Sequence, residues 1–251
     1  MFKKVLAAGI GIISILTLSF APLVNFNQPT FAAENCLIQT IDTSVWSPPS
    51  PDPSGIVYVP TSGRFLVVDG EVEEMPNLYT GKNVYETSSS GALLATHNTT
   101  TLPSNEPVGV GYNPNNGHFY IADDNERKIF DVDLGLDGVM GTGDDIVTNF
   151  STNLLGLNLD PEGVSFGNGF LYIAGGTANK IARIDPGPNG IFEGTNDDVI
   201  TSFDTLTLGA KDPEGVVYNP DNNSLFIVST KGVVIETTTA GSLLRTINIK
   251  P

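Results

Sequence analysis

The chain has 251 residues and a formal net charge of −16, from 28 acidic and 12 basic side chains. Like charge repels nucleic acids and anionic membranes, so neither is an expected partner. Cys36 is the single cysteine, which excludes an intrachain disulfide and leaves the fold to packing or to bound ions.

Residues 1–33 have the layout of a secretory signal peptide. Lys3 and Lys4 form a basic start, residues 5–24 are mostly apolar, and Phe31-Ala32-Ala33 supplies small residues before a cleavage point. The apolar run is also long enough for an uncleaved membrane anchor. We predict a signal peptide, hence a secreted, periplasmic or extracellular protein with no stable membrane span after cleavage.

Residues 34–51 precede the repeats described below. Apolar and polar residues alternate over residues 37–42, which predicts a lone strand. Residues 46–51 contain consecutive prolines, which cannot join the interior of a sheet, so we interpret them as a linker.

One unit recurs through the remainder of the chain. Residues 212–220 read Asp-Pro-Glu-Gly-Val-Val-Tyr-Asn-Pro, residues 160–166 nearly repeat them, and residues 106–114 and 52–60 are looser copies. The glycines at positions 55, 109, 163 and 215 stand 54, 54 and 52 residues apart. A fixed period of this length indicates stacked supersecondary units. We divide residues 52–251 into repeats 52–104, 105–158, 159–210 and 211–251.

Each repeat contains four short segments typical of strands. The first begins at the repeat glycine, and the segments in chain order are 56–58, 64–68, 83–87 and 92–96; 108–112, 118–122, 128–132 and 146–150; 164–166, 170–174, 180–184 and 199–203; 216–218, 224–228, 233–237 and 242–247. Four antiparallel strands per repeat predict an all-β fold, a β-propeller with about four recognisable blades. The blades either close a tight ring or form part of a larger propeller, whose unpaired edges would favour self-association.

The repeat unit resembles a known group of proteins. Asp-Pro-Glu-Gly-Val, followed by an apolar second strand that ends near an acid or a serine, is similar to the secreted six-bladed propellers of the NHL, gluconolactonase and esterase-like-phytase kind. The similarity covers about residues 52–249, with four repeats where those families have six blades. The resemblance implies a propeller that carries hydrolases, lactonases or binding modules, often with Ca²⁺ held in the central channel by acidic and amide side chains.

Acidic residues mark the start of every repeat. In a propeller the innermost strands line the channel, so these carboxylates should gather at one mouth, where they repel one another unless a cation or protons intervene. Oxygen ligands of this kind suit Ca²⁺. The alternative is that they cap turns and bond the backbone of the neighbouring blade. The candidate metal ligands at the mouth are Asp160, Glu162, Asp212 and Glu214.

Two glycine-rich acidic hairpins join the third and fourth strands of the middle repeats. Alternating oxygen side chains and glycines can fold around Ca²⁺, although the spacing differs from that of an EF-hand. The alternative is a long turn stabilised by Asx hydrogen bonds. The candidate ligands are Asp133, Asp137, Asp144 and Asp145 in one hairpin, and Asp185, Asn189, Asp197 and Asp198 in the other.

The sequence leaves enzymatic activity open and assigns no catalytic residue. His97 and His118 are the two histidines, and neither lies beside a nucleophile motif. The first hypothesis is an exported binding module for a protein, glycan or small molecule, stabilised by Ca²⁺. The second is a Ca²⁺-dependent hydrolase of a lactone, ester or phosphate that uses the carboxylates of the mouth.

Overall fold

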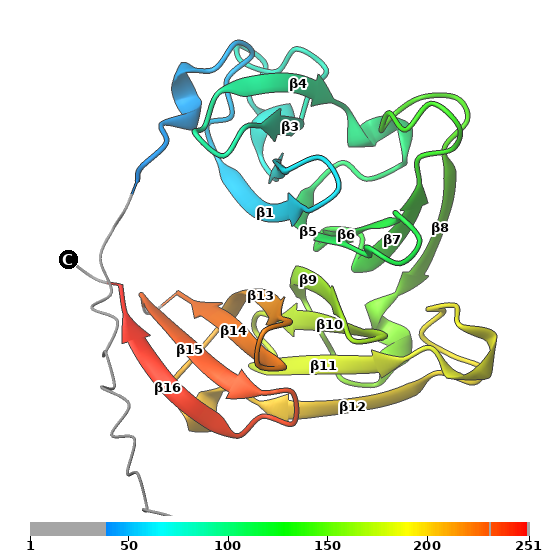
Figure 1. Cartoon of the computed structure of the whole chain (residues 1–251), viewed down its shortest axis with the longest axis vertical. Coiled ribbons are helices and arrows are strands. Elements are labelled where there is room, and N and C mark those ends of the chain that lie inside the picture. The colour runs from blue at the N-terminus through cyan, green and yellow to red at the C-terminus, as the bar shows by residue number, and fades with distance from the viewer. Residues whose placement is uncertain (1–38, 231, 250–251) are drawn as a thin grey trace, which may run out of the picture. The chain divides into compact units, whose positions relative to one another are not determined.

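Sixteen strands form four separate four-stranded antiparallel sheets in the described part of the chain, residues 39–230 and 232–249 of a computed structural model. These residues belong to a unit that starts at Gln39, one of the two units into which the chain divides. The predicted signal peptide, with Leu37 and Ile38, lies outside the described residues. The sheets follow one another around a common axis as the blades of a β-propeller (Figure 1).

The sixteen strands confirm the predicted segments to within a few residues. Blade 1 contains β1 (Pro53–Val59), β2 (Arg64–Asp69), β3 (Val84–Thr87) and β4 (Leu93–His97). Blade 2 contains β5 (Pro107–Tyr112), β6 (Phe119–Asp123), β7 (Lys128–Asp133) and β8 (Ile146–Ser151). Blade 3 contains β9 (Pro161–Gly167), β10 (Phe170–Gly175), β11 (Lys180–Asp185) and β12 (Val199–Asp204). Blade 4 contains β13 (Pro213–Asn219), β14 (Ser224–Ser229), β15 (Val233–Thr238) and β16 (Leu243–Asn248).

The only helices among the described residues are short 3₁₀ turns in the connections. They are η1 (Thr43–Val45), η2 (Val72–Glu74), η3 (Thr99–Thr101), η4 (Thr152–Leu155), η5 (Gly187–Asn189) and η6 (Leu206–Leu208). Within the described range, therefore, no helix has the length and hydropathy that crossing a bilayer requires.

Each inner strand begins at a proline, two residues before the repeat glycine, and not at the glycine as predicted. Proline suits the first position of a strand because it lacks the N–H that the ladder would use. A β-bulge follows in every blade, for example between Pro53 and Gly55 and between Pro213 and Gly215. The bulge places the residue before each repeat glycine at the mouth of the channel.

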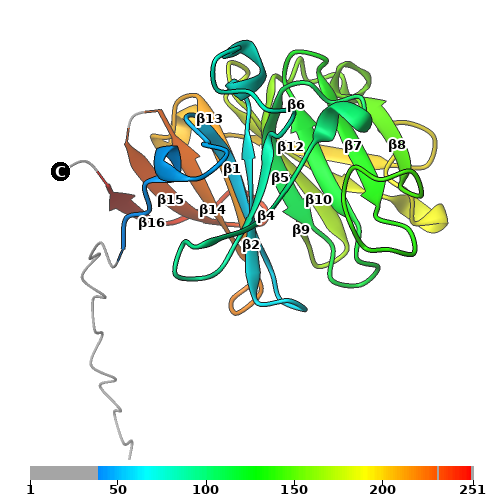
Figure 2. The ribbon, with the colours of Figure 1, turned by 90° about the horizontal axis from the view of Figure 1, so that it is seen from above.

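Repeat positions 55, 109 and 163 require glycine because the backbones of successive inner strands touch there and leave no room for a side chain. A Cβ atom added to Gly55 would lie 2.9 Å from the Cα atom of Gly109. The same construction gives 2.7 Å from Gly109 to Gly163, and 2.8 Å from Gly163 to Gly215. Any larger residue would force the blades apart, which explains the period seen in the sequence. In the perpendicular view of Figure 2, the neighbouring strands β1 and β5 run side by side.

The core consists of three apolar clusters, one between each pair of successive blades. Aromatic side chains bridge two of these interfaces: the rings of Tyr120 and Phe166 stack at 6.2 Å, and those of Tyr172 and Tyr218 at 6.1 Å. The interface between blades thus repeats one arrangement, in which an inner-strand aromatic of one blade meets the second strand of the blade before it.

The arc of blades is open between blade 4 and blade 1. The inner strands β1, β5, β9 and β13 are neighbours in that order, whereas β13 and β1 are not paired in this way among the described strands (Figure 1). A Cβ atom added to Gly215 would meet only the Cβ of Val228, at 4.0 Å. Among the described strands, therefore, the four blades do not close a tight ring.

The predicted strand over residues 37–42 is wrong for its described part, because residues 39–42 adopt no strand. Side-chain contacts, and no backbone ladder, hold the residues that follow, 43–51, to blade 1. The Nε1 atom of Trp46 donates to the Gly91 carbonyl (3.2 Å), and its ring lies 5.6 Å from that of Tyr85. Tyr85 Oη in turn donates to the Pro49 carbonyl (2.6 Å). Residues 43–51 thus cover the outer part of the free face of blade 1.

Candidate functional site

The acidic repeat starts of blades 3 and 4 lie together at one mouth of the channel. A cavity of about 290 Å³ is lined by inner strands from all four blades, with Glu162 and Glu214 among its walls. Asp160 and Asp212 lie near enough to Glu162 for their charges to act on it. Among the described residues, however, no three carboxylate, histidine or cysteine side chains are arranged to hold a metal ion.

Protonation relieves the repulsion between the carboxylates at this mouth. Burial raises the pKa of Glu162 to about 8, and the nearby charges of Glu214 and Asp124 add to the shift. Burial, followed by the charge of Asp124, raises the pKa of Glu106 to about 7. The pKa of Glu214 is also raised, again chiefly by burial. Glu162 therefore keeps its proton near neutral pH, and Glu106 titrates close to neutral pH.

Asp160 makes side-chain contacts instead of the backbone contacts that the alternative interpretation expected. Its Oδ1 atom lies 3.3 Å from Nη2 of Arg127, a residue of blade 2, and its Oδ2 atom accepts from Oγ1 of Thr177 (3.4 Å). Three mouth carboxyls were missed by the repeat pattern. Glu71, Glu73 and Asp124 come from loops between the second and third strands, and they influence the pKa of Glu106.

In the first acidic hairpin, residues 133–145, the carboxylates bond the backbone of their own loop. Asp144 Oδ2 accepts from the amides of Leu136 (2.8 Å) and Asp137 (3.2 Å), and Asp145 Oδ2 accepts from the amide of Gly141 (2.7 Å). Two more acids each accept from an amide two residues further on, namely Asp133 and Asp137.

The second hairpin, residues 185–198, repeats this arrangement. Asp197 accepts from the backbone and side-chain amides of Asn189 (3.1 and 2.8 Å), and Asp198 Oδ2 accepts from the amides of Glu193 (2.9 Å) and Gly194 (2.6 Å). Asp185 and Asn189 accept from amides two residues further on. The hairpins are therefore built as Asx-stabilised turns.

One oxygen in each hairpin stays without a partner. Asp145 Oδ1 and Asp198 Oδ1 occupy equivalent positions, are inaccessible to solvent and make no hydrogen bond. Burial raises the pKa of both carboxyl groups. An unpaired buried acceptor is costly, and a cation or a water at each position would relieve that cost.

The hairpins also hold neighbouring blades together. Each turns an apolar side chain, Met140 or Phe192, into the cluster between its own blade and the preceding blade, where both are buried. These residues stand 52 positions apart, the spacing of the last two repeat glycines. The two long hairpins therefore share the same packing role in the two middle blades.

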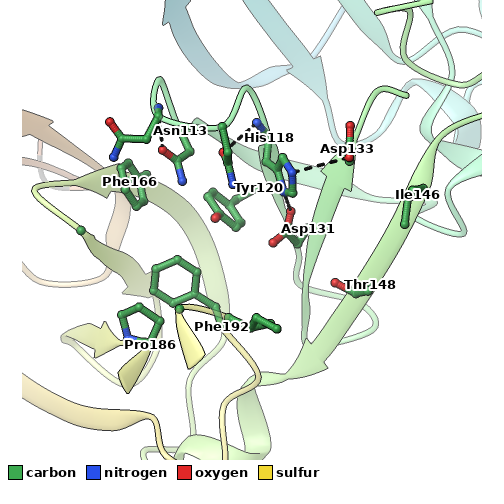
Figure 3. Close-up of a pocket in the computed structure, with 15 residues that line it drawn as sticks. Asn113, His118, Tyr120, Asp131, Asp133, Ile146, Thr148, Phe166, Pro186 and Phe192 are labelled. Atoms are coloured by element: carbon green, nitrogen blue, oxygen red, sulfur yellow. Dashed lines mark hydrogen bonds and ion pairs between the residues drawn. The ribbon is translucent and has the colours of Figure 1, made fainter. Parts of the chain in front are cut away.

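A larger cavity opens beneath the second hairpin, between blades 2 and 3 (Figure 3). It measures about 470 Å³, and it lies where the first and second strands of a blade turn, opposite the acidic mouth. Three aromatic side chains make its apolar wall: the ring of Tyr120 lies 5.6 Å from that of Phe192 and 6.2 Å from that of Phe166. Ile146 and Ile191, both more than half exposed, also line it.

Polar side chains face this wall from β7 and from the loop between β5 and β6. His118 Nδ1 lies 2.7 Å from Asp131 Oδ1, and His118 Nε2 lies 3.7 Å from Asp133 Oδ2 (Figure 3). Burial raises the pKa of Asp131, an effect that the hydrogen bond with His118 opposes. Asn113 hydrogen-bonds the hydroxyl of Tyr120. We call these residues, with the three aromatic side chains, the interblade pocket.

Sequence reasoning missed the interblade pocket, although a signal was present. In the hairpin of β6 and β7, Tyr120 pairs with Asp131. Side chains alternate along a strand, so residues 118 and 120 share a face with residues 131 and 133. Counting back from the turn between the two strands would have placed His118 among these carboxylates.

The fold defines the chain as a β-propeller. No family model matches it, and no curated protein matches its sequence. Among solved structures it is similar to a glutaminyl cyclase of Myxococcus xanthus, at 14% identity and a TM-score of 0.53, over 79% of this chain and 71% of that one. This likeness supports the fold alone.

Two further structures are similar at lower scores. One is a hydrazine synthase of Kuenenia stuttgartiensis, at 15% identity and a TM-score of 0.47, over 78% of this chain and 49% of that one. The other is a putative 6-phosphogluconolactonase of Bacteroides uniformis, at 16% identity and a TM-score of 0.48, over 80% of this chain and 58% of that one. The chain thus spans about half the length of the first and under two thirds of the second.

Proposed function

We propose that this chain is an exported binding module of the β-propeller class, whose interblade pocket takes a small neutral ligand rich in hydroxyl groups, such as a sugar ring. The observation that carries the proposal is a cavity of about 470 Å³ in which an aromatic wall faces histidine, carboxylate and amide side chains. Ligand pockets are mostly apolar cavities of roughly 300–1,000 Å³ with a few convergent polar groups.

The chemistry of the pocket supports a sugar over a charged ligand. The faces of a sugar ring carry C–H groups, which pack on an aromatic ring such as that of Phe166, the one ring of the three that is partly exposed. Its hydroxyl groups both donate and accept, and so match the acceptor oxygens of Asp131 and the amide of Asn113. An anion would meet the carboxylates of the pocket and the charge of −16 of the chain.

The same residues support binding more than catalysis. Both ring nitrogens of His118 face carboxylates, at 2.7 and 3.7 Å, so neither is directed at a nucleophile. The walls of the cavity contain no serine, cysteine or lysine. Thr148 supplies the one aliphatic hydroxyl, and no base is paired with it among the described hydrogen bonds.

Saturation-transfer NMR with a panel of neutral mono- and disaccharides tests the proposal. We expect at least one sugar to receive saturation from the protein, and Asp131→Asn and Phe166→Ala to weaken its binding about tenfold, the loss typical of one good contact. Tyr112→Ala is the matched control, since Tyr112 takes the place of Phe166 in the cleft between blades 1 and 2. No saturation for any sugar, or an equal loss in the control, would contradict the proposal.

We also propose that Ca²⁺ binds the two acidic hairpins and stabilises the fold. The matched unpartnered oxygens of Asp145 and Asp198 support this second role. Ca²⁺ prefers oxygen ligands, and the turn carboxylates nearby would complete its coordination with water. The ion would act on stability, because the hairpins hold adjacent blades together through Met140 and Phe192.

The hydrolase alternative would use the mouth of the channel, and one observation favours it. Glu162, with its pKa raised to about 8, is a carboxylic acid that keeps its proton near neutral pH, as a general acid requires. A panel of lactone, ester and phosphate substrates with and without Ca²⁺ tests this alternative. Turnover abolished by Glu162→Gln would support it, and no turnover on any of these substrates would contradict it.

A further inference from the structure

The two ends of the open arc expose positions that are buried everywhere else in the chain. On blade 1, Ile56 is 63% exposed, whereas its equivalents Val110, Val164 and Val216 are 5%, 3% and 8% exposed. The difference lies in the neighbour: Val110, Val164 and Val216 each pack against the blade before them, and the described residues place no blade before blade 1.

The free face of blade 4 shows the same contrast. Val228 is 40% exposed, whereas its equivalents Val68, Ala122 and Ala174 are completely buried. Val217, beside it on the inner strand, is 53% exposed. Gly215 retains the glycine that lets a following blade approach to backbone contact, yet only Val228 lies within 4.0 Å of its added Cβ atom.

We propose that a second copy of this chain docks its blade 1 against blade 4 of the first copy, through the same contact that joins successive blades within the chain. The two free faces are the two halves of one interface. Ile56 and Tyr58 would enter the site that Gly215, Val217 and Val228 leave open, just as Val110 and Tyr112 pack against blade 1. Continuity with an interface that already occurs three times carries the proposal.

The remainder of both faces fits this contact. On blade 4, the buried carboxylate of Glu236 pairs with Arg245 Nε (2.5 Å) and accepts a hydrogen bond from Asn222 Nδ2 (2.8 Å), so docking buries no unpaired charge at this position. On blade 1, residues 43–51 already cover the outer part of the face, and they leave the inner part around Ile56 and Tyr58 exposed.

Such a contact is head-to-tail, because different surfaces of the two copies meet. A head-to-tail contact closes into a ring when the rotation allows, and otherwise leaves free ends that add further copies. Each copy carries a charge of −16, which opposes association. Salt screens that repulsion, so we expect association to strengthen as ionic strength rises.

Sedimentation velocity of the full chain tests the proposal, over protein concentrations from about 1 to 100 µM and at two salt concentrations of roughly 0.05 and 0.5 M. We expect oligomers whose fraction rises with concentration and with salt. Ile56→Asp and Val228→Asp should each give monomers, with Leu136→Asp, at a fully exposed hairpin tip, as the control. Circular dichroism checks that each variant is folded.

Mixing the two monomeric variants gives the sharpest result. The Ile56→Asp chain keeps an intact blade 4 face, and the Val228→Asp chain keeps an intact blade 1 face, so the mixture should form dimers that neither variant forms alone. A wild-type chain that stays monomeric at every condition would overturn the proposal. Association that survives the single variants, or a mixture that stays monomeric, would overturn it as well.

Discussion

Gly163→Ala should destabilise the propeller strongly, whereas Gly215→Ala should not. Both glycines occupy the same position in their repeats, and neither has a positive φ, so alanine suits the backbone of each. The difference is in the space available. The Cβ atom of the first variant would lie 2.8 Å from the Cα atom of Gly215, and that of the second would meet only Val228 at 4.0 Å.

The size of the stability loss depends on which atoms must move to make room for the added methyl group. At Gly163 the neighbouring atoms belong to a backbone, which cannot change rotamer, so we take the upper part of the range for overpacking, about 3 kcal/mol. A domain of this size loses about 2–4 °C of Tm per kcal/mol, so the Tm should fall by about 6–12 °C. At Gly215 the restricted unfolded chain should stabilise the fold by about 0.4–1 kcal/mol.

Thermal unfolding followed by circular dichroism measures both variants. The protein is kept dilute so that it stays monomeric, because Gly215 also lies on the face proposed to bind a second copy. Equal losses of Tm in the two variants would refute the reasoning, since blade 4 would then have a neighbour at Gly215. A Gly163→Ala chain as stable as wild type would show that the inner strands do not touch.

Three further predictions follow from the same geometry. The pKa values of Glu162 (about 8), Glu106 (about 7) and Glu73 (about 7) are raised, so the folded chain holds more protons than the unfolded chain. The Tm should therefore fall as the pH rises from about 5 to 8.5, and Glu162→Gln should flatten that slope. A Tm that rises with pH would contradict this prediction. Phe192→Ala, at a buried ring, should cost about 3–5 kcal/mol in chemical unfolding, against less than about 1 kcal/mol for the exposed neighbour Ile191→Ala. Millimolar Ca²⁺ should raise the Tm by about 2–4 °C per site relative to EDTA. The double variant Asp145→Asn with Asp198→Asn should abolish this rise, and Asp221→Asn is the control. Identical melting curves in Ca²⁺ and EDTA would show that the hairpins are turns alone.

The repeat made most of the fold predictable from the sequence. A glycine recurs every 52–54 residues because each inner strand must touch the next one at that position. This spacing can be counted in the sequence. The predicted strand is absent from residues 39–42, the described part of residues 37–42, because alternation over six residues says nothing about a partner. Here a side-chain contact, Gln39 Nε2 to the Ser90 carbonyl, ties the segment to blade 1.

The candidate sites were harder to predict, because they depend on what differs between repeats. The mouth acids of the repeat starts were found from their period, whereas Asp124 was missed because it lies in a loop outside the repeated unit. The interblade pocket needs the register of β6 and β7 as well as the neighbouring blade that supplies Phe166. Pairing between blades is a tertiary property, so the sequence alone did not reveal this cavity.

The most direct test of the proposed function is a methyl NMR titration of the chain with isoleucine δ1 labels. Ile146 and Ile191 lie on the rim of the interblade pocket, and Ile56 is equally exposed on the far end of blade 1. The account predicts that the sugar found by saturation transfer shifts the resonances of Ile146 and Ile191 and leaves Ile56 unchanged. Shifts confined to Ile56, or no shift at the two rim residues at saturating sugar, would contradict it.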